Sequence, residues 1–77
     1  MNIRLLAFGQ IAEYLGYQES TTDHLPDTNA LHKHLLEVCP ELRHVSFVLA
    51  VNRKIIHQNQ PFQEGDEVAV LPPFSGG

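Results

Sequence analysis

Basic residues are scarce in this sequence of 77 residues. It contains 5 Lys and Arg against 9 Asp and Glu, which gives a formal net charge of −4. Nucleic-acid binding requires a basic stripe that neutralises phosphates, and the sequence has no such stripe. We therefore expect no nucleic-acid partner and, instead, a protein partner with a basic docking surface.

Cysteine and long hydrophobic runs are also rare. The single cysteine, Cys39, cannot form an internal disulfide, which is typical of a protein from a reducing compartment. The longest apolar runs, such as Phe47–Val51, are far too short to cross a membrane, and the N-terminal residues lack the pattern of a signal peptide. The expected location is the cytoplasm, with no membrane partner.

The length indicates one domain, residues 1–77, with a flexible C-terminal tail at 72–77. A chain this short cannot form a deep cleft between two domains, so we expect it to act through its surface or a terminus.

Hydrophobic periodicity predicts five strands, a short helical turn and one main helix. The turn covers 10–15 and is closed by Gly16, and the main helix extends from Asp27, its N-cap, to Cys39. The strands are expected at 2–8, 18–23, 47–51, 54–57 and 67–71, with a tight turn at 52–53. One amphipathic helix on one face of a mixed five-stranded sheet is an α+β roll, and the β-grasp fold fits best.

The predicted core combines inward strand positions with the apolar stripe of the main helix. Pro40 should end that helix, so that Leu42 belongs to a short extra turn. The core residues predicted from these patterns are Ile3, Leu5, Leu31, Leu35, Val38, Leu49, Val68 and Val70.

The histidines and Cys39 do not indicate a catalytic or metal site. His32 and His34 are two positions apart on a helix and therefore point in different directions, so we expect solvated histidines and no bound metal. Cys39 is expected to be a small core residue, because nothing in the sequence indicates a low thiol pKa.

Three stretches of the sequence resemble the small subunit of molybdopterin synthase, a sulfur carrier of the ubiquitin-like β-grasp family. They are FGQIAEYLG at 8–16, AVN at 50–52 and EGDEVAVLPPFSGG at 64–77. The third stretch is the most specific, because it combines Gly-Asp-Glu-Val, Pro-Pro and a final Gly-Gly.

The resemblance implies that the working group is the C-terminal carboxylate of Gly77. ATP would adenylate it, with AMP as the leaving group, and a sulfur donor protein would convert it to a thiocarboxylate. Phe74, Ser75 and Gly76 would thread into the partners' active sites, since glycine allows close approach of the backbone. Pro72-Pro73 would keep the arm extended. ATP and AMP would bind only transiently, and no permanent cofactor is expected.

The resemblance further implies that the chain is not an enzyme on its own. An E1-like adenylating enzyme would activate it, and the large catalytic subunit of molybdopterin synthase would use the sulfur to build the dithiolene of a pterin within a heterotetramer. A carrier for thiamin synthesis or transfer-RNA thiolation, and a ubiquitin-like protein modifier, are the alternatives with the same fold and tail.

Phe8, Ile55 and Leu71 are the predicted partner interface. Phe8 and Leu71 fall on the strand face opposite the predicted core, and the first and last strands of a β-grasp fold are neighbours. By resemblance, Ile55 joins them in docking the large subunit. The alternative is that these are scattered exposed apolar residues without a function.

Overall fold

The computed structural model describes residues 2–72. Its elements, in chain order, are β1 (Ile3–Ala7), α1 (Gly9–Leu15), β2 (Glu19–Thr22), α2 (Thr28–Val38), the 3₁₀ helix η1 (Pro40–His44), β3 (Val48–Val51), β4 (Lys54–Ile55) and β5 (Glu67–Leu71). This is the predicted element order. The fourth strand is shorter than the predicted 54–57 and ends at Ile55, although the Ile56 backbone N–H still donates to the Leu49 carbonyl at 3.0 Å.

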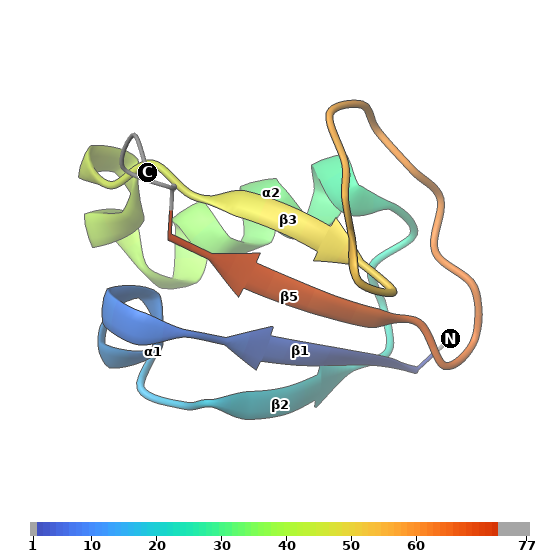
Figure 1. The fold of residues 1–77 in the computed structure, drawn as a ribbon, viewed down its shortest axis with the longest axis horizontal. Helices are drawn as coiled ribbons and strands as arrows, with labels where there is room; N and C mark the ends of the chain where they lie inside the picture. Colours follow the sequence, from blue (N-terminus) through green and yellow to red (C-terminus); the bar gives the residue numbers. More distant parts are fainter. Residues whose placement is uncertain (1, 73–77) are drawn as a thin grey trace.

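The strands form one mixed sheet in the order β2-β1-β5-β3-β4. The neighbours β1 and β5 are parallel, whereas the other strand pairs are antiparallel. Figure 1 shows α2 lying across one face of this sheet, with β1 and β5 side by side in its middle. The predicted α+β, β-grasp architecture is therefore confirmed.

The core lies between the inner face of the sheet and α2. Ile3 and Leu5 of β1 alternate with outward residues, as do Val68 and Val70 of β5, and all four inward side chains are at most 3 % exposed. Seven of the eight predicted core residues are buried.

Val38 is the exception, and its prediction as a core residue was wrong. Its side chain is 58 % exposed, while Cys39, the next residue, is buried. After Leu35, the buried residue is Cys39, four positions on, and not Val38, three positions on. This is because α2 ends at Val38 and Cys39 takes up non-helical C-cap geometry before Pro40. Leu42 is buried from η1, which confirms the predicted extra turn.

A local cap fixes the start of α2 and another fixes the end of α1. The Asp27 carboxylate accepts a hydrogen bond from the Ala30 backbone N–H at 2.8 Å, as predicted for an N-cap. Gly16 ends α1 in the left-handed conformation, at φ 83°, which glycine adopts without steric cost.

The tight turn between β3 and β4 is attached to the start of β5. Asn52 and Arg53 have positive φ values, 50° and 71°, which suits a two-residue hairpin turn. The Asn52 side chain donates to Asp66 Oδ1 at 3.0 Å and accepts from the Glu67 N–H at 3.1 Å. Asp66 is buried and also accepts from the Gln63 N–H, so this carboxylate organises the turn before β5.

Candidate functional site

The outer face of the sheet, opposite α2, carries a continuous set of apolar side chains. We call it the outer-face patch, and it comprises Leu6, Phe8, Val48, Ala50, Ile55, Ala69 and Leu71.

Strand register brings these residues together. Leu6 pairs with Ala69, Ala69 with Ala50, and Ala50 with Ile55, which makes one row across four strands. A second row contains the pair Val48 and Leu71. Phe8 extends this second row, because it follows Ala7 in extended geometry and Ala7 pairs with Val70.

The three predicted interface residues therefore lie on the same face. Phe8 is 47 % exposed and Ile55 is 43 % exposed. Leu71 is only partly exposed, because β5 has neighbouring strands on both sides. The sequence analysis did not name Val48, Ala50 or Ala69, which connect Ile55 with Phe8 and Leu71. The alternation within each strand shows that these residues face outward, but only the strand order shows that they are neighbours.

Charged residues border the outer-face patch on the β2 side. Arg4 lies 3.1 Å from a Glu19 carboxylate oxygen and 3.3 Å from a Glu67 carboxylate oxygen. One guanidinium thus lies between two carboxylates, and this part of the rim keeps a negative balance. An apolar centre with a polar rim is the usual composition of a protein–protein interface.

The end of β5 places the start of the tail beside this patch. Because β1 and β5 are parallel, both strands end on the same side of the sheet (Figure 1), and Phe8 and Pro72 are the residues that follow them. Gly9, at φ 57°, follows Phe8, and a Cβ on Gly9 would lie 3.7 Å from Pro72 Cγ. Pro72 therefore packs against the junction of β1 and α1. The predicted tail residues Pro73, Phe74, Ser75, Gly76 and Gly77 lie outside the described residues.

Cys39 does not have the environment of a reactive thiol. Its Sγ is buried, 3.4 Å from the Tyr14 carbonyl oxygen and 3.5 Å from Glu41 Oε1. Burial, and secondly the hydrogen bond to Glu41, raise the pKa of the Cys39 thiol. The thiolate fraction is lowered accordingly, which fits the predicted role as a small core residue.

Three of the five histidines make ring contacts. His32 stacks on Phe47 with ring centroids 4.9 Å apart, and His24 meets His34 edge-on at 5.6 Å. Within residues 2–72, no group of three or more His, Cys, Asp or Glu side chains is placed to hold a metal ion. In the same part of the chain, none of the helices has the length and apolar character needed to span a membrane.

The sequence profile of the ThiS family matches residues 5–77, nearly the whole chain. The chain belongs to the ThiS family. The ThiS-family match includes the second half of β1, whose last residue precedes Phe8, and all of β5, which leads into the tail.

Full-length similarity narrows the assignment within the ThiS family. The chain is 32 % identical to the molybdopterin synthase sulfur carrier subunit of Escherichia coli, over 97 % of this chain and 99 % of that protein. It is therefore a member of the molybdopterin synthase sulfur carrier subunit family, as the sequence motifs predicted.

Two solved structures have the same β-grasp fold. One chain in the structure of the complex of subunits 1 and 2 of molybdopterin-converting factor from Helicobacter pylori matches with a TM-score of 0.73. Its identity is 25 %, and the match covers 100 % of both chains. The small archaeal modifier protein 1 of Methanosarcina acetivorans matches with a TM-score of 0.78 and 20 % identity, covering 99 % of this chain and 96 % of that one. At this identity the second likeness shows the fold alone.

Proposed function

We propose that this chain carries sulfur on the C-terminal carboxyl group of Gly77 and delivers it to a cyclic pterin precursor. The observations that carry the proposal are the full-length similarity to molybdopterin synthase sulfur carriers and the ThiS-family match, which extends to Gly77. The alternatives with the same tail, carriers for other pathways and protein modifiers, are supported less directly.

The proposed chemistry begins with activation of a poor electrophile. The Gly77 carboxylate attacks the α-phosphorus of ATP, which releases pyrophosphate and leaves an acyl-adenylate. A sulfur nucleophile at the oxidation level of sulfide then attacks the acyl carbon, and AMP leaves with the bonding electron pair. The product is a thiocarboxylate, whose sulfur is a good nucleophile toward the pterin precursor. ATP and AMP are substrates and products here, not resident cofactors.

The outer-face patch is the proposed docking surface for the large catalytic subunit. The Helicobacter pylori structure contains subunits 1 and 2 in one complex, which supports a partner of this kind. We expect two such pairs in a heterotetramer. An E1-like adenylating enzyme and a sulfur donor protein complete the set of proposed partners, and the cytoplasm, where a lone cysteine stays reduced, is the proposed location.

The geometry fits a division between docking surface and reacting arm. Residues 72–77 span at most about 20 Å when extended. Pro72 starts this arm next to Phe8 and Leu71, so a partner that covers the outer-face patch would need its reaction centre within that reach. The partners would supply the catalytic groups, and this chain would supply the sulfur.

A mass measurement tests the proposed carboxyl chemistry. Incubating the protein with ATP, the adenylating enzyme and a sulfur source should increase its intact mass by one oxygen-to-sulfur exchange. Tandem fragmentation should place the change on Gly77. Sulfur found on Cys39 would contradict the proposal, because it would be a persulfide rather than a thiocarboxylate.

Phe8→Lys is expected to weaken binding of the large subunit by about tenfold or more. A large, exposed aromatic side chain in an interface contributes strongly, and a lysine there would face a basic partner surface. Isothermal titration calorimetry with the purified large subunit measures the change.

Val38→Lys is the matched control for Phe8→Lys. Val38 is an apolar residue of even greater exposure, 58 %, but lies on α2 away from the outer-face patch. The Val38→Lys variant should bind the large subunit with an affinity within about twofold of that of the unchanged protein, since residue 38 would not contact the large subunit. If Phe8→Lys folds normally and binds as well as Val38→Lys, the outer-face patch is not the docking surface.

A further inference from the structure

Strand β2 is an open edge of the sheet. Figure 1 shows it as the outermost strand, and within residues 2–72 it pairs with β1 alone. The Ala7 N–H donates to the Gln18 carbonyl at 2.9 Å, so every second residue from Gln18 onward turns its backbone groups to β1. Glu19 and Thr21 lie between these residues, and their N–H and C=O groups point away from the sheet. None of these groups bonds another described residue, so the edge can accept a further strand.

A hollow of about 380 Å³ lies beside this edge, on the face of the sheet that α2 covers, and we call it the β2-edge hollow. Ser20 and Thr22 line it, because their partners in β1 are core residues and all of these side chains point to the same face. The remaining walls come mainly from α1 and α2. A strand added to β2 would therefore direct alternate side chains into the β2-edge hollow.

The β2-edge hollow contains two exposed apolar side chains. The large hydrophobic residues exposed in the described part of the chain are Phe8, Tyr14, Val38 and Ile55. Phe8 and Ile55 belong to the outer-face patch. Tyr14, which is 37 % exposed, and Val38, which is 58 % exposed, line the β2-edge hollow instead. An open strand edge beside a hollow for alternate side chains is a recurring arrangement for binding extended peptides.

Carboxylates are found at both ends of β2. Glu19 starts the strand, and its side chain shares Arg4 with Glu67, so these three side chains keep a net negative charge. Asp23 follows the strand with a side chain that is 76 % exposed, and its Oδ1 lies 3.5 Å from His24 Nδ1. No Lys or Arg is among the described residues that line the β2-edge hollow. A basic segment is therefore favoured over an acidic one. A second copy of this chain has a net charge of −4 and no basic residue in its own β2, so it fits less well.

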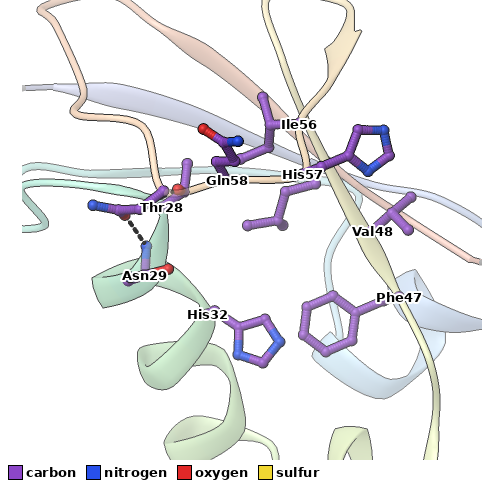
Figure 2. A pocket seen from close by; sticks show the side chains of 10 residues that line it. Thr28, Asn29, His32, Phe47, Val48, Ile56, His57 and Gln58 are labelled. Atoms are coloured by element: carbon purple, nitrogen blue, oxygen red, sulfur yellow. Dashed lines mark hydrogen bonds between the residues drawn. The ribbon is translucent and has the colours of Figure 1, made fainter.

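The opposite edge of the sheet lacks this combination. The edge strand there, β4, has only two residues. Figure 2 shows the hollow between α2 and β3, and backbone groups around it are already bonded. The Leu49 carbonyl accepts from the Ile56 N–H, and the Asn29 N–H donates to Asn59 Oδ1 at 2.8 Å. Strand addition is therefore expected at β2.

We propose that β2 and the β2-edge hollow bind an extended segment of a partner protein, in which basic residues flank two apolar residues. In this pairing the residues opposite Ser20 and Thr22 enter the hollow, and the basic residues lie near Glu19 and Asp23. The pattern basic-apolar-polar-apolar-basic is the same in both directions, so it suits parallel and antiparallel pairing alike. The proposal does not depend on the sulfur-carrier function, because the β2-edge hollow and the outer-face patch lie on opposite faces of the sheet.

Three peptides test the proposal. The probes, acetylated and amidated, are Lys-Lys-Val-Thr-Val-Lys-Lys, Glu-Glu-Val-Thr-Val-Glu-Glu and Lys-Lys-Val-Pro-Val-Lys-Lys, each titrated into ¹⁵N-labelled protein. The first should bind at least about tenfold more tightly than the acidic peptide. It should also bind at least about fivefold more tightly than the third, because proline has no N–H to donate to β2. Amide shift changes should concentrate from Glu19 to Asp23 and at Val38.

Two lysine variants separate the β2-edge hollow from general electrostatics. Val38→Lys should weaken binding of the basic threonine peptide by about fivefold or more, whereas Phe8→Lys, an equal change of net charge on the opposite face, should weaken it by less than about twofold. Failure of the basic threonine peptide to bind, an equal affinity for either of the other peptides, shift changes on the outer-face patch, or equal effects of the two variants would each overturn the proposal. Concentration-dependent shifts in β2 without peptide would overturn it in favour of a second copy of this chain.

Discussion

Deletion of Gly77 is expected to abolish sulfur transfer without lowering the stability of the domain. The truncated chain would present its carboxyl group one residue, about 3.5 Å, short of the reacting nucleotide, a displacement that catalytic geometry does not tolerate. The buried core cluster extends from Ile3 to Val70, so the deletion removes none of its side chains. Thiocarboxylate formation by mass spectrometry and urea unfolding of the same sample measure the two outcomes.

A lengthened variant controls for this deletion. One alanine appended after Gly77 keeps both glycines but moves the carboxyl group past the nucleotide, so adenylation should again be lost. Both variants should still bind the large subunit through the outer-face patch. Full sulfur transfer by the truncated chain would contradict the proposed role of Gly77, whereas loss of unfolding free energy would show that the tail contributes to the fold.

Leu35→Ala is expected to lower the free energy of unfolding by about 2–5 kcal/mol. Leu35 is fully buried on α2, and its truncation leaves a cavity between the helix and the sheet. For a domain of this size, whose total stability is only about 5–10 kcal/mol, this is a large fraction. Urea unfolding followed by circular dichroism measures the change.

Val38→Ala is the control on the same helix. The exposed Val38 loses little contact when truncated, and alanine has the better helix propensity, so the cost should be below about 0.5 kcal/mol. Equal costs for the two substitutions, or a larger cost at Val38, would contradict the burial seen in the structure and restore the stripe expected from the sequence.

The strands were predictable because each carries its own pattern. In β1 and β5, successive residues point to opposite faces of the sheet. Because the charged residues Arg4 and Glu67 must face outward, the pattern leaves only one choice of inward residues. Asp27 and Gly16 likewise mark helix ends through chemistry that acts within a few residues. Such local signals need no knowledge of the tertiary structure.

The failures have non-local causes. Positions 38 and 39 both fit the helical stripe that starts at Leu31, and the choice of Cys39 depends on how the chain turns into η1. The link between Ile55 and Ala69 through Ala50 depends on the strand order, which no local pattern specifies. The stack of His32 on Phe47 joins residues of two different segments, so it could not be foreseen from helical periodicity alone.

The central position of β5 has a mechanical consequence. In the proposed function the tail enters a partner's channel and has to be pulled out again, and the tension would enter the domain through β5, which is hydrogen-bonded to β1 on one side and β3 on the other. When the domain is held at its docked face, this pull shears both ladders along their length, so that many hydrogen bonds must break together. An edge strand such as β2 would peel away one bond at a time. The tail is thus attached to a strand that is held on both sides, and repeated withdrawal need not unravel the domain.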